Sequence, residues 1–541
     1  MKTNMPGLLV LAAGFTFAAA VSRAVEPATE PLTLQDVIRI ALENNPDLRL
    51  QEIDRQIAEK EARGESYYWE PEAVVSGKRY NNSRQNTVEQ EISQFSPTFE
   101  ERNTSLSAAL EGTVASGGKW RLGYSLDELS NNLTNQNFRT RAAFDEEYAS
   151  IASISFSQPL LRNFGPAVTR SQLRNAELNH EVAKQELRRR RMLTIGRAEL
   201  GYWSAWQSVR AVDLRAKSLE IVKSLLEDNK NRLKEGRVSQ MDVDQTRAGV
   251  ALRERRWLEA RTEANEAAKA LASLLGWTAR DAQPVIKAEI LEIGDPVVTD
   301  FDQAMTRAVS SHPDMLIRQK EIEIENLRLV VARNQSWPQL DLVGSYGYNG
   351  LGEDVPESWD RLSEGEYQNW SVELVFRMGL GGDRKARSQL EQTKLRHERA
   401  LLGYQATESD LANAMRSVMN KARLVRDTQL ALARETDVNR AALDAEKVLL
   451  AEGKSNSRRV LELEEDLVDV QVLYETACAN YRRVLVELDM TDGGMLARRG
   501  LEEAAKGPGF VEVTAAPQAP APPPRGCPPP PPGAPPPWPP P

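Results

Sequence analysis

The chain repeats itself once. Pro46 in "ALENNPDLRL" and Pro313 in "AVSSHPDMLI" are offset by 267, and Pro71 and Pro338 share this offset. Proline lacks an N–H and fixes φ, so it is tolerated in the first turn of a helix and disrupts a helix interior. The repeat therefore predicts two equivalent places where a short helix ends and a new helix begins at the proline.

A second set of matches continues the repeat at a shorter spacing. Gly165 and Gly382 are offset by 217, as are Gly236 and Gly453. Because the offset falls from 267 to 217, the first half is longer by 50 positions between its second proline and its first glycine. A period this long excludes a solenoid of small repeats and indicates two large, similar halves, the first with an insertion.

Each half reads as a helix, strands, a very long helix, a tight turn and a returning helix. Residues 167–235 contain no proline, and as one helix they would span roughly 100 Å, which is too long for a single globular core. Such a helix must pack laterally against others. The returning helix of the second half has apolar residues in alternating steps of three and four, the pattern of a coiled coil. These residues are Val460, Leu463, Leu467, Val470, Tyr474, Ala477, Tyr481, Val484 and Leu488.

In the segments between the helices, apolar and polar residues alternate with a period of two. The apolar members are Leu340, Leu342, Tyr346 and Tyr348; Trp370, Val372, Leu374, Phe376 and Met378; Ile154 and Phe156; and Trp120, Leu122, Tyr124 and Leu126. A half-buried antiparallel sheet gives the same pattern. Strands of about ten residues with aromatics near their ends, in an exported chain, favour a membrane β-barrel. So few strands cannot close a channel-sized barrel, and lipid does not tolerate open sheet edges, so several chains must share one barrel.

The insertion in the first half is predicted to include an added hairpin. Residues 106–115 and 119–127 both alternate, and Gly117 and Gly118 lie between them. Glycines at this place suit a hairpin turn. The pattern does not say whether this hairpin widens a barrel or projects from it.

The ends of the chain differ from its middle. Residues 1–24 combine Lys2, an apolar run and small residues, as a secretory signal peptide does, with cleavage expected after Ala24 or Ala20. No later run reaches the roughly 18 apolar residues of a transmembrane helix. Sixteen of the 30 prolines lie in residues 517–541, so residues 507–541 are expected to form a proline-rich disordered tail.

Composition excludes several classes of protein. The net charge of −9 gives no basic surface for nucleic acid. Two cysteines, Cys478 and Cys527, are too few for a disulfide framework. His180, His312 and His397 are isolated and have no metal-ligand spacing. "FRMGLGGDRKA" and "AEGKSNS" lack the full spacing of nucleotide-binding loops. We predict no enzyme, no catalytic residue, no cofactor and no metal site.

Together the motifs resemble the TolC-like outer-membrane efflux channel family over roughly residues 33–492. The resemblance rests on "LTLQDVIRIALENNPDL", "SISFSQPLLRNFG", "LKEGRVSQMDVDQTRAGV", "VELVFRMGLGGDRKARSQLEQ" and "LAEGKSNSRRVLELEEDLVDVQ", in order and at matched spacing. It implies a first repeat at 33–276, an equatorial segment at 277–300 and a second repeat at 301–492. The implied fold is mainly α with a membrane β-barrel.

The resemblance also implies an assembly and a function. A homotrimer would share one β-barrel in the outer membrane and one long α-helical barrel in the periplasm. It would serve as the passive exit duct of a tripartite efflux system for small molecules, reaching an inner-membrane pump through a periplasmic adaptor. Two alternatives stay open: an exit duct for type I protein secretion, and an exported coiled-coil scaffold without a barrel.

By the same resemblance, the two helical turns are the periplasmic tips where a hexameric adaptor docks. The tip residues are Gly236, Arg237, Val238, Ser239, Gly453, Lys454, Ser455 and Asn456. Glycine suits these turns because a residue that ends a helix commonly adopts a positive φ. The alternative is an ordinary loop without a partner.

The family guards its entrance with acidic rings just above the tips. Asp242 and Glu462 match this pattern, but Arg459 stands where the second half would carry an acid. We hypothesise that Arg459 pairs with Asp242 or Glu462, within or between protomers, and holds the periplasmic end shut. The alternative is that Arg459 is a solvated surface residue.

Overall fold

The computed structural model describes residues 31–94, 97–131, 147–277, 284–286 and 300–501. The predicted signal peptide and proline-rich tail lie outside these residues, as does most of the expected equatorial segment. The chain divides into two compact units. Unit 1 comprises Met1–Asn44, Arg197–Ile293 and Thr428–Asn480, and unit 2 comprises Asn45–Gly196, Gly294–Asp427 and Tyr481–Pro541.

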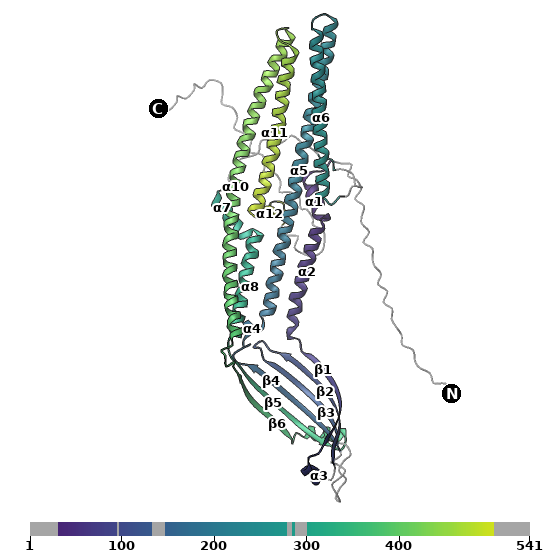
Figure 1. Cartoon of the computed structure of the whole chain (residues 1–541), viewed down its shortest axis with the longest axis vertical. Coiled ribbons are helices and arrows are strands. Elements are labelled where there is room, and N and C mark those ends of the chain that lie inside the picture. The colour runs from purple at the N-terminus through teal and green to yellow at the C-terminus, as the bar shows by residue number, and fades with distance from the viewer. Residues whose placement is uncertain (1–30, 95–96, 132–146, 278–283, 287–299, 502–541) are drawn as a thin grey trace, which may run out of the picture. The chain divides into compact units, whose positions relative to one another are not determined.

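Helices of the two halves correspond in pairs, which confirms the duplication (Figure 1). In chain order the larger ones are α1 (Leu34–Asn44), α2 (Pro46–Ser66), α5 (Ser171–Lys234), α6 (Gln240–Leu274), α7 (Phe301–Ser311), α8 (Pro313–Gln335), α10 (Arg384–Ala451) and α11 (Ser457–Thr491). The shorter ones are a 3₁₀ turn at Tyr67–Trp69, α3 (Val88–Gln94), α4 (Pro166–Thr169), α9 (Val355–Glu364) and α12 (Met495–Arg498). Both ends of α7 are offset from those of α1 by 267, and both ends of α11 are offset from those of α6 by 217.

The repeated prolines lie where the sequence predicts them. Pro46 and Pro313 each open a helix, directly after a residue that caps it. The side chain of Asn45 accepts from the backbone N–H of Asp47 at 2.9 Å, and His312 Nδ1 accepts from that of Asp314 at 3.2 Å. The helix breaks therefore follow from proline chemistry and local capping.

Unit 1 is built from helices packed through an apolar core. Trp206 on α5, 1% exposed, lies among Val37 and Ala41 of α1, Leu271 of α6 and Ala479 of α11. Burial of one large apolar side chain stabilises by about 1.5–3 kcal/mol, so this cluster is a major source of stability for the unit. The predicted seam of α11 is buried or half-buried along its length, which confirms the coiled-coil pattern.

A six-stranded antiparallel sheet lies in unit 2 (Figure 1). Its strands are β1 (Glu72–Gln85), β2 (Thr98–Thr113), β3 (Lys119–Asn131), β4 (Glu147–Pro159), β5 (Gln339–Gly352) and β6 (Gln368–Arg377), paired in sequence order. The predicted hairpin is confirmed as β2 and β3. Its arms are longer than expected because each continues the ladder of its outer neighbour.

Apolar and polar residues alternate along the strands, so the sheet has one apolar face and one polar face. The register places Leu122 opposite Leu110 and Ile154, and Leu342 opposite Leu374, all on one face. The other face carries hydroxyl pairs, with Oγ–Oγ distances of 2.7 Å for both Ser76–Ser107 and Ser345–Ser371. The period-two reading of these segments is confirmed.

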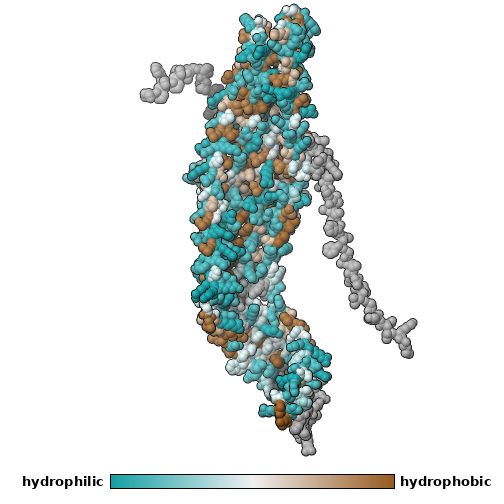
Figure 2. All heavy atoms as spheres, in the orientation of Figure 1, coloured by the Kyte–Doolittle hydropathy of each residue, from teal (hydrophilic) through white to brown (hydrophobic). Residues whose placement is uncertain are grey.

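Unit 2 has its own helical core. Ala304 and Ala308 of α7, Met315 of α8 and Met415 of α10 pack together, each at most 1% exposed. On the face that Figure 2 shows, the helices carry largely hydrophilic residues with hydrophobic ones scattered among them. Within the described residues, no helix combines the length and apolar character needed to cross a membrane.

Candidate functional site

The turn between α5 and α6 ends one helix and caps the next. Gly236 has φ +75°, and the N–H of Arg237 donates to the carbonyl of Arg232 at 2.8 Å. This arrangement satisfies the last carbonyls of α5 and requires the left-handed conformation that glycine adopts without strain. Ser239 then begins α6 as its N-cap.

Asp242 belongs to this cap. Its carboxylate accepts from Ser239 Oγ at 2.6 Å and from the Ser239 N–H at 2.9 Å, while Ser239 Oγ accepts in turn from the Asp242 N–H at 3.2 Å. These hydrogen bonds, the side-chain one first, lower the pKa of Asp242 below its usual value of 3.8. Asp242 is thus the acidic member of a capping box, at the third position of the helix, and the box fixes the start of α6.

The turn between α10 and α11 repeats this geometry. Gly453 has φ +73°, and the N–H of Lys454 donates to the carbonyl of Leu449 at 2.9 Å. Asn456 Oδ1 accepts from the N–H of Arg459 at 2.9 Å, and Ser455 Oγ donates to Glu446. In the two turns Val238 and Ser455 are half-buried and the other six tip residues are exposed.

Arg459 pairs with Glu462 within one chain. The distance from Arg459 Nη1 to Glu462 Oε2 is 3.3 Å, and Arg458 Nε contacts Glu462 Oε1 at 3.0 Å. Hydrogen bonds from Arg458 first and Arg459 second lower the pKa of Glu462. The Arg459 and Glu462 side chains are about half exposed, so in one chain the pair is a surface interaction.

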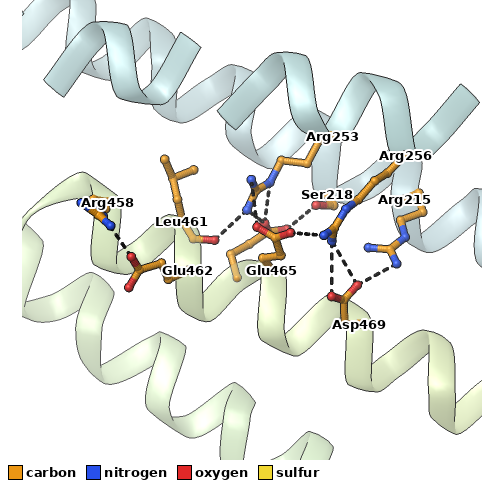
Figure 3. A network of polar contacts seen from close by, with 10 residues as sticks. Arg215, Ser218, Arg253, Arg256, Arg458, Leu461, Glu462, Glu465 and Asp469 are labelled. Carbon is orange, nitrogen blue, oxygen red and sulfur yellow. Dashed lines mark hydrogen bonds and ion pairs between the residues drawn. The ribbon is translucent and has the colours of Figure 1, made fainter. Parts of the chain in front are cut away.

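A network of charged residues, with Arg253 and Glu464 buried at its centre, lies within unit 1 further along the helices from the turns (Figure 3). Arg253 of α6 donates to Glu464 Oε2 of α11 from Nε at 3.1 Å and from Nη2 at 2.9 Å. Arg253 Nη2 also donates to the carbonyl of Leu461 at 2.6 Å, and Ser218 Oγ of α5 donates to Glu464 Oε1 at 2.5 Å. Arg253 and Glu464 are 5% and 2% exposed. Both charges are therefore desolvated and depend on these partners.

The network continues along the same three helices. Arg256 of α6 pairs with Glu465, and its Nη1 lies 3.3 Å from Asp469 Oδ1. Arg215 of α5 reaches Asp469 at 2.7 Å. Arginines from α5 and α6 therefore meet the carboxylates of α11, as Figure 3 shows.

A neutral polar cluster lies between the network and the tips. Asn229 Nδ2 donates to Thr246 Oγ1 at 2.8 Å and to Ser457 Oγ at 2.9 Å, and all three residues are buried. This cluster joins α5, α6 and α11, the helices that the charged network also joins. Hydrogen bonds of this kind fix the register between helices, because a shift of one turn would leave each group unpaired.

Sequence reasoning missed these internal partners. Glu464 adjoins the predicted seam position Leu463, and charged residues beside a seam are ordinarily solvated. The sequence does contain a signal that could have predicted these ion pairs. The second half has an excess of acids in "LELEEDLVD", and the equivalent returning helix of the first half has a cluster of arginines in "LRERRW". Among the described residues, no group of three or more His, Cys, Asp and Glu is arranged to hold a metal ion.

The chain is similar to known outer-membrane channels. The family model "Outer membrane efflux protein" matches residues 304–494. The crystal structures of CusC have a TM-score of 0.58 at 14% identity and cover 85% of this chain and 92% of theirs. CmeC of Campylobacter jejuni has a TM-score of 0.55 at 15% identity, with 90% and 94% covered. VceC of Vibrio cholerae has a TM-score of 0.56 at 14% identity, with 85% and 96% covered. No curated protein sequence matches. These likenesses confirm the resemblance and the fold.

Proposed function

We propose that this chain is the outer-membrane exit duct of a tripartite efflux system, because residues 304–494 match the outer membrane efflux protein family. Three copies share one β-barrel in the outer membrane and one helical barrel in the periplasm. The duct is passive and carries small molecules delivered by an inner-membrane pump through a periplasmic adaptor.

Within the structure, the proposal is supported by the two-faced sheet, whose outermost described strands are β1 and β6. On its apolar face, Trp370, Val372 and Leu374 of β6 are 71%, 70% and 63% exposed. A contiguous apolar surface of this kind needs lipid or another protein to cover it. A polar opposite face suits the water-filled interior of a barrel. The sheet therefore favours a channel over a coiled-coil scaffold without a barrel.

The two turns are the proposed docking points for the adaptor. Arg237 and Lys454 are 75% and 68% exposed, and each pairs with a neighbour in its own turn, Glu235 and Glu452 respectively. Capping and positive-φ glycines hold both turns in defined shapes, and a defined surface loses little conformational entropy on binding. The two halves thus present similar docking points, matching the repeat in the sequence.

The periplasmic gate is part of the same proposal. Asp242, Arg459 and Glu462 lie within about two helical turns of the tips. Asp242 is used by the cap of α6, so the Arg459–Glu462 pair is the better candidate for a contact that closes the end. Three copies crowded around an axis would partly desolvate this pair, and the attraction between its two charges grows as the local dielectric constant falls.

Co-purification tests the proposal most directly. The tagged chain should fractionate with outer membranes, migrate as a heat-modifiable trimer, and bring down an adaptor and a pump. Reversal of the exposed tip charges, Arg237→Glu with Lys454→Glu, should leave the trimer intact and reduce adaptor recovery. Reversal of Arg255, an exposed cation on α6 away from the tips, is the matched control.

Two results would contradict the proposal. If the chain is absent from the outer-membrane fraction, or never forms the trimer, the proposed exit duct is wrong. A co-purified transporter that exports polypeptides would select type I secretion in its place.

A further inference from the structure

The duplication identifies β2 and β3 as an addition to the sheet. The start of β5 is offset from that of β1 by 267, and β6 overlaps the segment that lies at an offset of 217 from β4. In the second half, residues 339–377 are described throughout and contain only β5, α9 and β6. Each half therefore contributes one equivalent pair of strands, and β2–β3 lies between the members of the first pair.

The added hairpin is hydrogen-bonded on both sides. Strand β1 pairs with β2 from Glu72↔Glu111 to Gln85↔Thr98, and β3 pairs with β4 from Lys119↔Ser157 to Leu129↔Glu147. A hairpin that projected from a barrel would leave β1 to pair with β4. The ladders place β2 and β3 in the plane of the sheet.

The turn between β2 and β3 is held in place by contacts with the end of β4 and the residues that follow it. Ser116 Oγ donates to Gln158 Oε1 at 2.7 Å, and the carbonyl of Ser116 accepts from the N–H of Gly165 at 3.0 Å. Gly117 has φ +92°, and a Cβ there would lie 2.5 Å from the carbonyl oxygen of Asn163. The turn is thus seated against the segment that follows β4.

Both faces of the sheet continue across the hairpin. Leu106, Leu110 and Leu122 lie on the apolar face and are 55%, 46% and 52% exposed, close to the 51% of Ile154 on β4. On the polar face, Arg121 Nη1 lies 2.9 Å from Glu111. An apolar outer face and a polar inner face are what a strand in a barrel wall requires.

The open edges determine what completes the sheet. Antiparallel order over six strands makes β6 run opposite to β1, so rotation about an axis brings β6 of one copy beside β1 of the next in antiparallel orientation. Unpaired strand edges are not tolerated in lipid, and an identical chain supplies a matching edge. The partner that this surface fits is a second copy of this chain.

We propose that the hairpin widens the shared barrel, so that three copies close a wall of 18 strands, six from each copy. This inference rests on the trimer of the proposed function. Without β2 and β3 the same trimer would have 12 strands. Because barrel diameter grows roughly linearly with strand number, the hairpin makes the membrane part about 1.5 times wider.

Electron cryomicroscopy of the full chain in lipid nanodiscs tests the inference. The wild type should show 18 strands around a threefold axis. In a deletion variant, Asn-Gly replaces residues 86–147, so that Gln85 precedes the new turn and Tyr148 follows it. This junction keeps the apolar residues of β1 and β4 on one face. The variant should show 12 strands and about two-thirds of the wild-type diameter.

A matched control replaces only residues 132–146 with a short polar linker and should keep 18 strands. If the deletion variant does not fold, the wild-type count still decides. A wild-type trimer with 12 strands would overturn the inference and leave the exit duct intact. A wild-type protein with no barrel shared between copies would overturn both.

Discussion

Loss of Arg253 should destabilise the helical part far more than loss of a surface arginine. In Arg253→Met, Glu464 keeps Ser218 as a hydrogen-bond donor and loses both bonds from the guanidinium. Glu464 is 2% exposed, so water cannot replace them without local opening. Removal of one partner from a buried ion pair typically costs about 3–5 kcal/mol.

The matching change in the partner should recover most of this loss. In Arg253→Met with Glu464→Leu, no buried charge is left alone, and replacement of a buried pair by apolar residues is often neutral or stabilising. Arg255→Met on the same helix is the control, because Arg255 and Glu259 are 59% and 54% exposed. An exposed pair of this kind contributes about 0–1 kcal/mol.

Denaturant unfolding of the purified protein at fixed concentration, with loss of helix content as the signal, measures the change in the free energy of unfolding. The double-mutant cycle isolates the coupling between Arg253 and Glu464. If Arg253→Met costs no more than Arg255→Met, the buried network does not stabilise the packing of α6 on α11. If the double variant is as unstable as Arg253→Met, the loss comes from packing, and the unpaired carboxylate is not its cause.

Two further predictions concern the tips. The capping hydrogen bonds lower the pKa of Asp242 below its ordinary value of 3.8. Their contribution is therefore present above the unfolded pKa and is lost as pH falls through the lower folded value. Protection of the first turn of α6 against amide exchange, corrected for intrinsic rates, should fall in strong acid, and Asp242→Asn should lack this fall. Arg459→Ser should raise single-channel conductance and cation preference in planar bilayers, since it removes a cation from the proposed gate. If conductance and cation preference are unchanged, the ion-pair gate is wrong, and the proposal of an exit duct is unaffected.

Much of the fold follows from local rules that a sequence displays. Within a helical pattern Pro46 and Pro313 are tolerated only in a first turn, and Gly236 and Gly453 suit the positive φ that ends a helix. These helix boundaries can therefore be predicted from the sequence. The strands could be predicted for a similar reason. Apolar and polar residues that alternate over about ten positions indicate a β-strand. The outer end of β2 could not be predicted from the sequence, because "TFEERN" is polar and forms a strand only through its ladders to β1 and β3.

The candidate site was predictable only in part. Asp242 reads as a capping residue as readily as a gate residue, because Ser239 lies three positions before it. The partner of Arg459 within the chain is three residues away, a spacing at which helical side chains meet. Arg253 and Glu464 are 211 residues apart, and their meeting depends on how α6 packs on α11, which no local pattern states.

The buried contacts that join α11 to α5 and α6 also bear on how the proposed periplasmic gate would open. Any opening that separates α11 from both α5 and α6 must break the Arg253–Glu464 pair of α6 and α11 and release Ser457 of α11 from Asn229 of α5. A Cβ at Gly249 would lie 3.2 Å from Leu461 Cδ1. Cysteines at these two positions are therefore close enough to be joined by a short, cleavable bifunctional thiol reagent.

In a background without Cys478 and Cys527, the joined pair should hold conductance at the closed level, and cleavage of the link should restore opening. Cysteine at Gly249 alone, treated identically, is the control. If the linked protein opens as freely as the protein whose link has been cleaved, α6 and α11 move together. The buried network is then part of a rigid body that does not change when the proposed gate opens.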